Sequence, residues 1–129
     1  MLIKLLRSKI HQATVTRTDV NYHGSITIDG DLLRASGLIP NEGVLVADVD
    51  NGNRFETYVI AGEPGSGVIA INGAAARLSK VGNRVIIMSF AMVQPTDAAG
   101  HWSRVVMVNA QNKVIETLKQ TSVLGDVAR

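Results

Sequence analysis

The peptide bond between Gly24 and Ser25 is the point in this sequence where the residue types suggest covalent chemistry. A serine hydroxyl can attack the carbonyl carbon of the residue before it, which converts the amide into an ester. An ordinary backbone resists this attack because the amide is planar and stable, so the reaction needs strain and a polarised carbonyl. Gly24 would permit such strain because glycine adopts conformations closed to other residues. Taken alone, Gly-Ser is typical of a turn.

Arg54 and Tyr58 form a second candidate pair, because they stand four residues apart in a segment that is expected to be a strand. Side chains alternate across a strand, so Arg54, Glu56 and Tyr58 share one face while Thr57 points to the other. A guanidinium can bind a carboxylate through two hydrogen bonds. Without further context, Tyr58 is typical of a half-buried strand tyrosine, and Arg54 and Lys9 are typical of solvated side chains.

Short β-strands separated by turns must position these residues. Apolar patterning predicts strands over residues 2–6, 10–17, 25–28, 44–49, 55–61, 68–71, 84–92 and 105–108. Asp50-Asn51-Gly52-Asn53 is a strong hairpin signal. Residues 32–36 predict one short helix, with Asp31 as its N-cap and Gly37 as its end. Many short strands with only brief helices favour a small β-barrel.

The composition indicates one compact domain over residues 1–129. A hydrophobic content of 46% with 19% charged residues excludes a disordered chain. The sequence has no cysteine, which excludes disulfides and thiolate metal sites and suits a reducing cytoplasm. Within the domain, residues 72–78 are expected to be a loop that enters one helical turn. The residues beyond Lys119 show no pattern and are expected to be loose.

The charge distribution gives little support for a nucleic-acid or membrane partner. The formal net charge is +2, and the basic residues are scattered singly along the chain. Charges at Lys4, Arg7 and Lys9 interrupt the N-terminal segment, and the longest apolar run, residues 85–93, is too short to span a bilayer. Because neither a signal peptide nor a membrane span is indicated, we expect a cytoplasmic protein. Three isolated histidines without acidic partners argue against a metal site.

The residues around these candidates carry a resemblance to one known family. The matching positions are Lys9 to Thr16, Asp19, Tyr22, Gly24-Ser25, Ile28-Asp29, Asn51-Gly52, Arg54, Thr57-Tyr58 and Asn72 to Ala76. With these residues in register and without gaps, the chain resembles the pyruvoyl-dependent aspartate 1-decarboxylases over most of its length.

The resemblance implies that the chain cuts itself between Gly24 and Ser25, with the help of Thr57. The products would be fragments 1–24 and 25–129, and the larger one would begin with a covalent pyruvoyl group derived from Ser25. Its ketone would form a Schiff base with L-aspartate and accept electrons as CO2 leaves. The released β-alanine would serve pantothenate and coenzyme A synthesis. Neither pyridoxal phosphate nor a metal would be needed.

The resemblance also assigns residues, fold and assembly. Ser25 and Tyr58 would be catalytic, Tyr58 as the proton donor, while His11 and Tyr22 would have secondary places near the site. The substrate-binding residues would be Lys9, Arg54, Thr57, Asn72, Gly73, Ala74 and Ala75. The implied fold is mainly β, a small six-stranded double-psi β-barrel with short helices. It would assemble as a homotetramer with active sites at subunit contacts, and the involvement of a maturation helper protein is left open.

Two other functions are compatible with parts of the sequence. A non-enzymatic barrel could bind nucleic acid or protein, but the aromatic residues are too few and dispersed for base stacking. A pyruvoyl decarboxylase for a different amino acid is the second alternative, and Lys9 with Arg54 favours a dicarboxylate instead. Ala47, Pro64 and Arg77 depart from the family pattern, which leaves substrate affinity less certain than reaction type.

Overall fold

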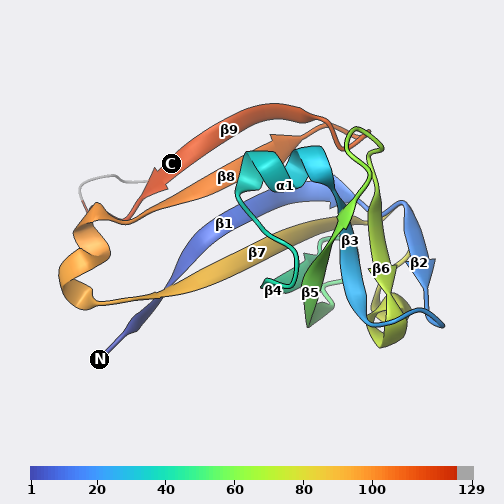
Figure 1. Cartoon of the computed structure of the whole chain (residues 1–129), viewed down its shortest axis with the longest axis horizontal. Coiled ribbons are helices and arrows are strands. Elements are labelled where there is room, and N and C mark those ends of the chain that lie inside the picture. Colours follow the sequence, from blue (N-terminus) through green and yellow to red (C-terminus); the bar gives the residue numbers. More distant parts are fainter. Residues whose placement is uncertain (125–129) are drawn as a thin grey trace.

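The computed structural model describes residues 1–124, and Figure 1 shows how their elements are arranged. The strands are β1 (Ile3–Thr14), β2 (Arg17–Asp19), β3 (Ser25–Asp29), β4 (Gly43–Asp48), β5 (Arg54–Gly62), β6 (Ile69–Asn72), β7 (Arg84–Val93), β8 (Trp102–Val108) and β9 (Val114–Thr121). The helices are α1 (Gly30–Ser36) and two 3-10 helices, η1 (Gly73–Leu78) and η2 (Pro95–Gly100). The prediction of a mainly β chain with short helices is confirmed.

The described strands form one connected sheet in the order β2-β6-β3-β5-β4-β7-β1-β8-β9. Neighbours are antiparallel except for the parallel pairs β2–β6, β3–β5 and β1–β8. Figure 1 shows β2, β3 and β6 at one end of the molecule, whereas β7, β8 and β9 extend toward the other. The fully buried large side chains are Ile10, Val15, Ile26, Ile28, Leu32, Val46, Val59, Ile69, Ile71, Val85, Ile87 and Val106.

Strand β5 has the alternation that the sequence predicts. Arg54 and Tyr58 are exposed on one face, while Phe55 and Val59 are buried on the other. Thr57, which shares the face of Phe55 and Val59, is half-buried. The predicted side-chain directions on this strand are therefore confirmed.

The prediction for the start of α1 is wrong by two residues. The N-cap is Asp29, whose Oδ1 accepts a hydrogen bond from the backbone N–H of Asp31 at 2.8 Å. Asp29 can fill this role because it ends β3 with its side chain buried beside the first turn. The predicted end at Gly37 is confirmed, since Gly37 has φ 78° and donates its N–H to Leu33 O at 2.8 Å.

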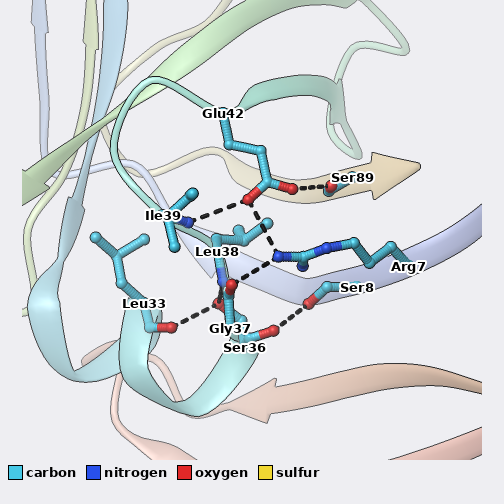
Figure 2. Close-up of polar contacts among 9 residues, drawn as sticks. All are labelled: Arg7, Ser8, Leu33, Ser36, Gly37, Leu38, Ile39, Glu42 and Ser89. Carbon is cyan, nitrogen blue, oxygen red and sulfur yellow. Dashed lines mark hydrogen bonds and ion pairs between the residues drawn. The ribbon is translucent and has the colours of Figure 1, made fainter. Parts of the chain in front are cut away.

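Strand β1 is continuous where the sequence predicts a break between residues 6 and 10. The polar residues there have specific partners, which Figure 2 shows. Arg7 donates to Gly37 O at 2.8 Å and contacts Glu42 Oε1 at 3.4 Å, and the Ser8 hydroxyl donates to Ser36 O at 2.7 Å. These contacts join the middle of β1 to the segment that follows α1.

The sequence analysis missed strand β9, as well as the short strand β2 and the 3-10 helix η2. All eight residues of β9 are exposed, so its sequence carries no buried face that alternation could reveal. The expectation of a loose tail beyond Lys119 is wrong at its start, because β9 continues to Thr121. The rest of that expectation reaches residues 125–129, which lie outside the described residues, as does the end of the expected 25–129 fragment.

In the described part of the chain, none of the helices is long and apolar enough to cross a membrane.

Candidate active site

Ser25 is the first residue of β3 and lies opposite Asn72, the last residue of β6, in the antiparallel β3–β6 pair. The Ser25 side chain is fully buried. The Asn72 side-chain amide donates to Ser25 Oγ at 2.9 Å and to Thr27 Oγ1 at 3.1 Å. Ser25 Oγ in turn donates to His23 O at 3.3 Å. The candidate nucleophile is therefore held in place by a residue from a neighbouring strand.

Strand alternation explains why this cluster is polar while its surroundings are apolar. Ser25 and Thr27 point to one face of β3, and Ile26 and Ile28 point to the other face and are fully buried in the core. The packed core therefore fixes β3, and with it the position of the Ser25 hydroxyl. Thr27 is a member of this cluster that the sequence analysis did not single out, although its position two residues after Ser25 is a usable signal.

Gly24 does not use the conformational freedom that the sequence analysis assigned to it. Its φ lies outside the left-handed region, and the residue is exposed. Gly73, which is buried at the start of η1 directly after Asn72, is a glycine near this bond with a left-handed conformation, at φ 79°. The positive φ that favours glycine is therefore found at Gly73, next to the residue that pairs with Ser25, and not at Gly24.

Thr57 and Tyr58 lie on β5, the parallel neighbour of β3. The register aligns Ile26 with Val59, the residues that directly follow Ser25 on β3 and Tyr58 on β5. Tyr58 is exposed and Thr57 is half-buried.

A cavity of about 460 Å³ adjoins the Ser25–Asn72 cluster. It is lined by Arg17, Asp19, Tyr22, Thr27, Ile60, Ala61 and Asn72. Tyr22 and Asn72, two predicted site residues, therefore share one cavity. Arg17 is a cation at this cavity that the sequence analysis did not consider, because a single arginine at the end of a predicted strand gives no signal of such a place.

Lys9 and His11 do not line this cavity. They line a different cavity of about 420 Å³, together with Val105, Met107, Leu118, Lys119 and Gln120. The His11 Nδ1 atom is buried and has no hydrogen-bond partner among the described residues. Burial and the nearby charge of Lys9 lower the pKa of His11 below its usual value.

The sheet register shows how far Lys9 is from Tyr58 within one chain. Lys9 on β1 pairs with Met88 on β7, Met88 pairs with Leu45 on β4, and Leu45 pairs with Glu56 on β5. Three strand spacings amount to about 14 Å around the sheet. A single chain therefore does not bring Lys9 to the strand that carries Tyr58.

The remaining predicted residues are Arg54, Ala74 and Ala75. Arg54 is exposed at the start of β5, where it is paired with Ala47 on β4. Ala74 is exposed and Ala75 is half-buried on η1, one turn beyond Asn72. One chain thus assembles the bond, its nearest polar partners and one cavity, but not the complete predicted set.

The geometry around Ser25 places a fixed hydroxyl beside the peptide bond that precedes it. A sequence model of the aspartate decarboxylase family matches residues 1–115. The chain belongs to the aspartate decarboxylase family. Membership confirms the resemblance found in the sequence, and the aspartate decarboxylase family is a pyruvoyl-dependent one.

Curated relatives in the aspartate decarboxylase family match along nearly their whole length. A protein of Caldicellulosiruptor saccharolyticus named aspartate 1-decarboxylase is 52% identical over 116 residues, covering 90% of this chain and 91% of the relative. One of the same name from Pelotomaculum thermopropionicum is 53% identical and covers 90% of this chain and 88% of the relative. A third protein of this name, from Carboxydothermus hydrogenoformans, is 46% identical, and the match covers 97% of this chain and 98% of the relative.

Proposed function

We propose that this chain is an aspartate 1-decarboxylase that converts L-aspartate to β-alanine and CO2, after cutting itself between Gly24 and Ser25. The observation that carries the proposal is the buried Ser25 hydroxyl, which accepts a hydrogen bond from Asn72 at 2.9 Å in a chain of this family. The β-alanine serves pantothenate and coenzyme A synthesis, and we place the reaction in the cytoplasm, where those pathways run.

Self-cleavage begins when Ser25 Oγ attacks the Gly24 carbonyl carbon. The C–N bond breaks, the hydroxyl proton passes to the Ser25 nitrogen, and an ester joins the two residues. Loss of the Ser25 α-proton then expels the Gly24 carboxylate and leaves a dehydroalanine, which water converts into a pyruvoyl group and ammonia. Fragments 1–24 and 25–129 result. Thr57, on the strand that is the parallel neighbour of β3, is proposed to hydrogen-bond the oxyanion of the attack.

The mature pyruvoyl ketone supplies an electron sink for the departing carboxylate, without pyridoxal phosphate or a metal. Tyr58 donates a proton to the product, and Lys9 and Arg54 bind the carboxylates of L-aspartate. Asn72, Gly73, Ala74 and Ala75 line the substrate site with Thr57, and His11 and Tyr22 lie at its periphery. The cavity that Tyr22 and Asn72 share beside Ser25 supports this arrangement.

The active sites form at contacts between subunits of a homotetramer. The support within one chain is the separation of about three strands between Lys9 and Tyr58, which a neighbouring subunit would close. A helper protein for maturation is compatible with this scheme, since the exposed Gly24 is accessible from outside.

The fold that we propose is a six-stranded double-psi barrel made of β6, β3, β5, β4, β7 and β1, which are neighbours in that order. The ends of this series meet, because the Thr16 N–H donates to Ile69 O at 2.8 Å and the Ile69 N–H donates to Thr16 Oγ1 at 3.0 Å. Thr16 lies in the two-residue connection between β1 and β2, and Ile69 begins β6. Strands β2, β8 and β9 would then lie outside the barrel.

The function is tested by incubating the purified protein with L-aspartate and measuring β-alanine and CO2. Wild type is expected to turn over. Ser25→Ala is expected to stay one chain without activity, because no pyruvoyl precursor remains. Tyr58→Phe is expected to be cleaved normally but to lose about 10²-fold or more in kcat, the usual range for a positioned proton donor. A fully active Ser25→Ala protein would overturn the proposal.

The substrate is tested separately with the mature protein. L-Glutamate and L-alanine serve as competitors because they change the length or remove the second carboxylate. Since two cations are assigned to two carboxylates, kcat/KM should be highest for L-aspartate. A higher value for a monocarboxylic amino acid would contradict the assignment of Lys9 and Arg54.

A further inference from the structure

Gly73 lies against the backbone of His23 and Gly24, just before the bond that is proposed to break. Its φ of 79° is one that residues with side chains rarely adopt. A Cβ at this position would lie 2.6 Å from Gly24 Cα, 2.9 Å from Gly24 N and 3.4 Å from the carbonyl carbon of His23. All three are backbone atoms, which cannot swing aside as a flexible side chain can. The 23–24 backbone therefore packs on Gly73 as closely as a bare Cα allows.

Asn72 and Gly73 hold opposite sides of the same bond. Asn72 donates to the Ser25 hydroxyl, which is the attacking group, and Gly73 supports Gly24, which carries the carbonyl under attack. The two are adjacent in sequence and both are buried, and Asn72 ends a strand in which every residue is buried. A rigid dipeptide thus fixes the nucleophile and the acyl group relative to each other.

We propose that Gly73 is a positioning residue for self-cleavage: its missing side chain lets Gly24 rest against η1 within reach of the Ser25 hydroxyl that Asn72 holds. This inference rests on the proposed self-cleavage and adds a residue to it. The resemblance assigned Gly73 to the substrate site alone. The contact with Gly24 gives it a role before any substrate is present.

The open side of Gly24 explains why this contact matters. A Cβ at Gly24 would meet no heavy atom of the described residues within 4 Å beyond its chain neighbours. Gly73 therefore supplies the packing on one side, and solvent lies on the other. Attack on a carbonyl requires the reacting atoms to be about 3–3.5 Å apart, and a displacement of about 1 Å can cost about 10²-fold in rate. A side chain at residue 73 would push Gly24 toward the open side.

The test compares Gly73→Ala with Gly52→Ala. Gly52 has φ 78°, almost the same as Gly73, but a Cβ there would meet nothing within 4 Å. The control therefore carries the same backbone strain without the contact. Both variants are purified with the wild type, and the appearance of fragments 1–24 and 25–129 is followed by denaturing mass spectrometry. We expect Gly73→Ala to be cleaved about 10²-fold more slowly and Gly52→Ala within about threefold of wild type.

A second measurement identifies the slowed step. Hydroxylamine cleaves an ester and leaves a hydroxamate on Gly24, so it reports how much chain has undergone the initial attack. The hydroxylamine-sensitive fraction should fall in Gly73→Ala and stay unchanged in Gly52→Ala, while circular dichroism and chromatographic size match wild type. A general loss of stability would also change the circular dichroism or the chromatographic size, so it can be told apart from a slower initial attack. In a Ser25→Ala background, amide exchange of residues 21–24 should rise about tenfold with Gly73→Ala while β6 is unchanged.

Each other result counts against the inference. Cleavage of a folded Gly73→Ala protein at the wild-type rate would overturn it, as would an unchanged hydroxylamine-sensitive fraction. If Gly73→Ala does not fold while Gly52→Ala does, Gly73 is required by the fold and the positioning role is rejected. If wild type itself is not cleaved, the proposed self-processing fails, and the inference about Gly73 fails with it.

Discussion

At the scale of single residues, the orientation of the Ser25 hydroxyl depends on its hydrogen-bond partners. Asn72 contacts both Ser25 and Thr27, and all three belong to the antiparallel β3–β6 pair. A hydrogen bond of this kind contributes about 1 kcal/mol. The orientation of the nucleophile is therefore sensitive to one amide group.

Asn72→Ala is expected to slow self-cleavage about fivefold, because losing a hydrogen bond worth about 1 kcal/mol in the orientation of the Ser25 hydroxyl corresponds to about that factor in rate. The measurement is the rate of fragment formation by denaturing mass spectrometry. Asn53→Ala is the matched control, since the Asn53 amide donates to Leu78 O at 3.0 Å on the exposed surface. Equal rates for Asn72→Ala and Asn53→Ala would contradict the role of Asn72.

Asp29 gives a prediction for acid stability. Burial acts to raise its pKa, but the backbone N–H groups of Asp31, Gly67 and Gly65 and the charge of Lys113 outweigh burial, so the pKa lies below its usual value. A lowered folded-state pKa means that the charged side chain stabilises the fold above the unfolded pKa of about 3.9. This contribution is lost as pH falls through the folded-state pKa.

Asp29→Asn should therefore unfold at a lower temperature than wild type at pH 7, and the difference should shrink below about pH 3.9. Calorimetry of both proteins between pH 7 and pH 2.5 measures this. The exposed Asp97→Asn variant is the control and should follow wild type throughout. A difference that is constant with pH, or that grows in acid, would show that the Asp29 charge does not stabilise the fold.

The sequence allowed part of the residue-scale picture to be predicted. The bond between Gly24 and Ser25 was identified because its residue types and neighbours match a family pattern. The left-handed conformation of Gly73 beside this bond could not be predicted, since it depends on how η1 meets the 23–24 backbone. The spacing of residues in the sequence does not report that contact. We therefore expected the unusual backbone conformation at Gly24, whereas Gly73 adopts it.

At the scale of elements, the segment between α1 and β4 is held by Glu42. Figure 2 shows its carboxylate accepting from the Ile39 N–H, from the Arg7 guanidinium and, through a short hydrogen bond, from the Ser89 hydroxyl. Its side chain is 17% exposed, so these groups are partly removed from water. One carboxylate therefore connects β1, β7 and the loop after α1.

Glu42→Ala should lower the free energy of unfolding by about 2 kcal/mol, because hydrogen bonds to a charged group are lost and their donors are left partly buried. Urea unfolding followed by circular dichroism measures the change. Glu63→Ala, at an exposed position, is the control and should change stability by less than about 0.5 kcal/mol. A Glu42→Ala protein as stable as this control would rule out a stabilising role for the contacts.

Element prediction succeeded where one face is buried and failed where none is. The pattern of β5 is visible in the sequence because Phe55 and Val59 alternate with exposed residues. β9 was missed because its pairing with β8 is made by the backbone while its side chains all remain exposed. In β1, Arg7 and Ser8 looked like a break because their partners near α1 are about thirty residues away in sequence.

At the scale of the whole molecule, the predicted site is divided. Ser25, Asn72, Thr57 and Tyr58 lie on the adjacent strands β3, β6 and β5, while Lys9 faces β8 and β9. Sequence analysis could not anticipate the separation, because the order of strands around the sheet follows from tertiary pairing. In the proposed function, the assembly of subunits reunites the two parts.

Co-expression of Lys9→Ala with Tyr58→Phe tests that arrangement. If a site takes Lys9 from one subunit and Tyr58 from another, random mixing leaves about one quarter of the sites with both wild-type residues. Each variant alone should have little activity, and the mixture should recover about a quarter of the wild-type value. Activity no greater than the average of the two variants would place Lys9 and Tyr58 in the same subunit's site or outside it.

The central claim is that the bond between Gly24 and Ser25 breaks and leaves a pyruvoyl group. The denatured mass of the purified protein, taken after a long warm incubation, tests it most directly. The account predicts two fragments that meet at this bond, with the larger one lighter by one ammonia than a peptide beginning with serine. A single full-length mass that persists after incubation with host-cell extract, with no turnover of L-aspartate, would contradict it.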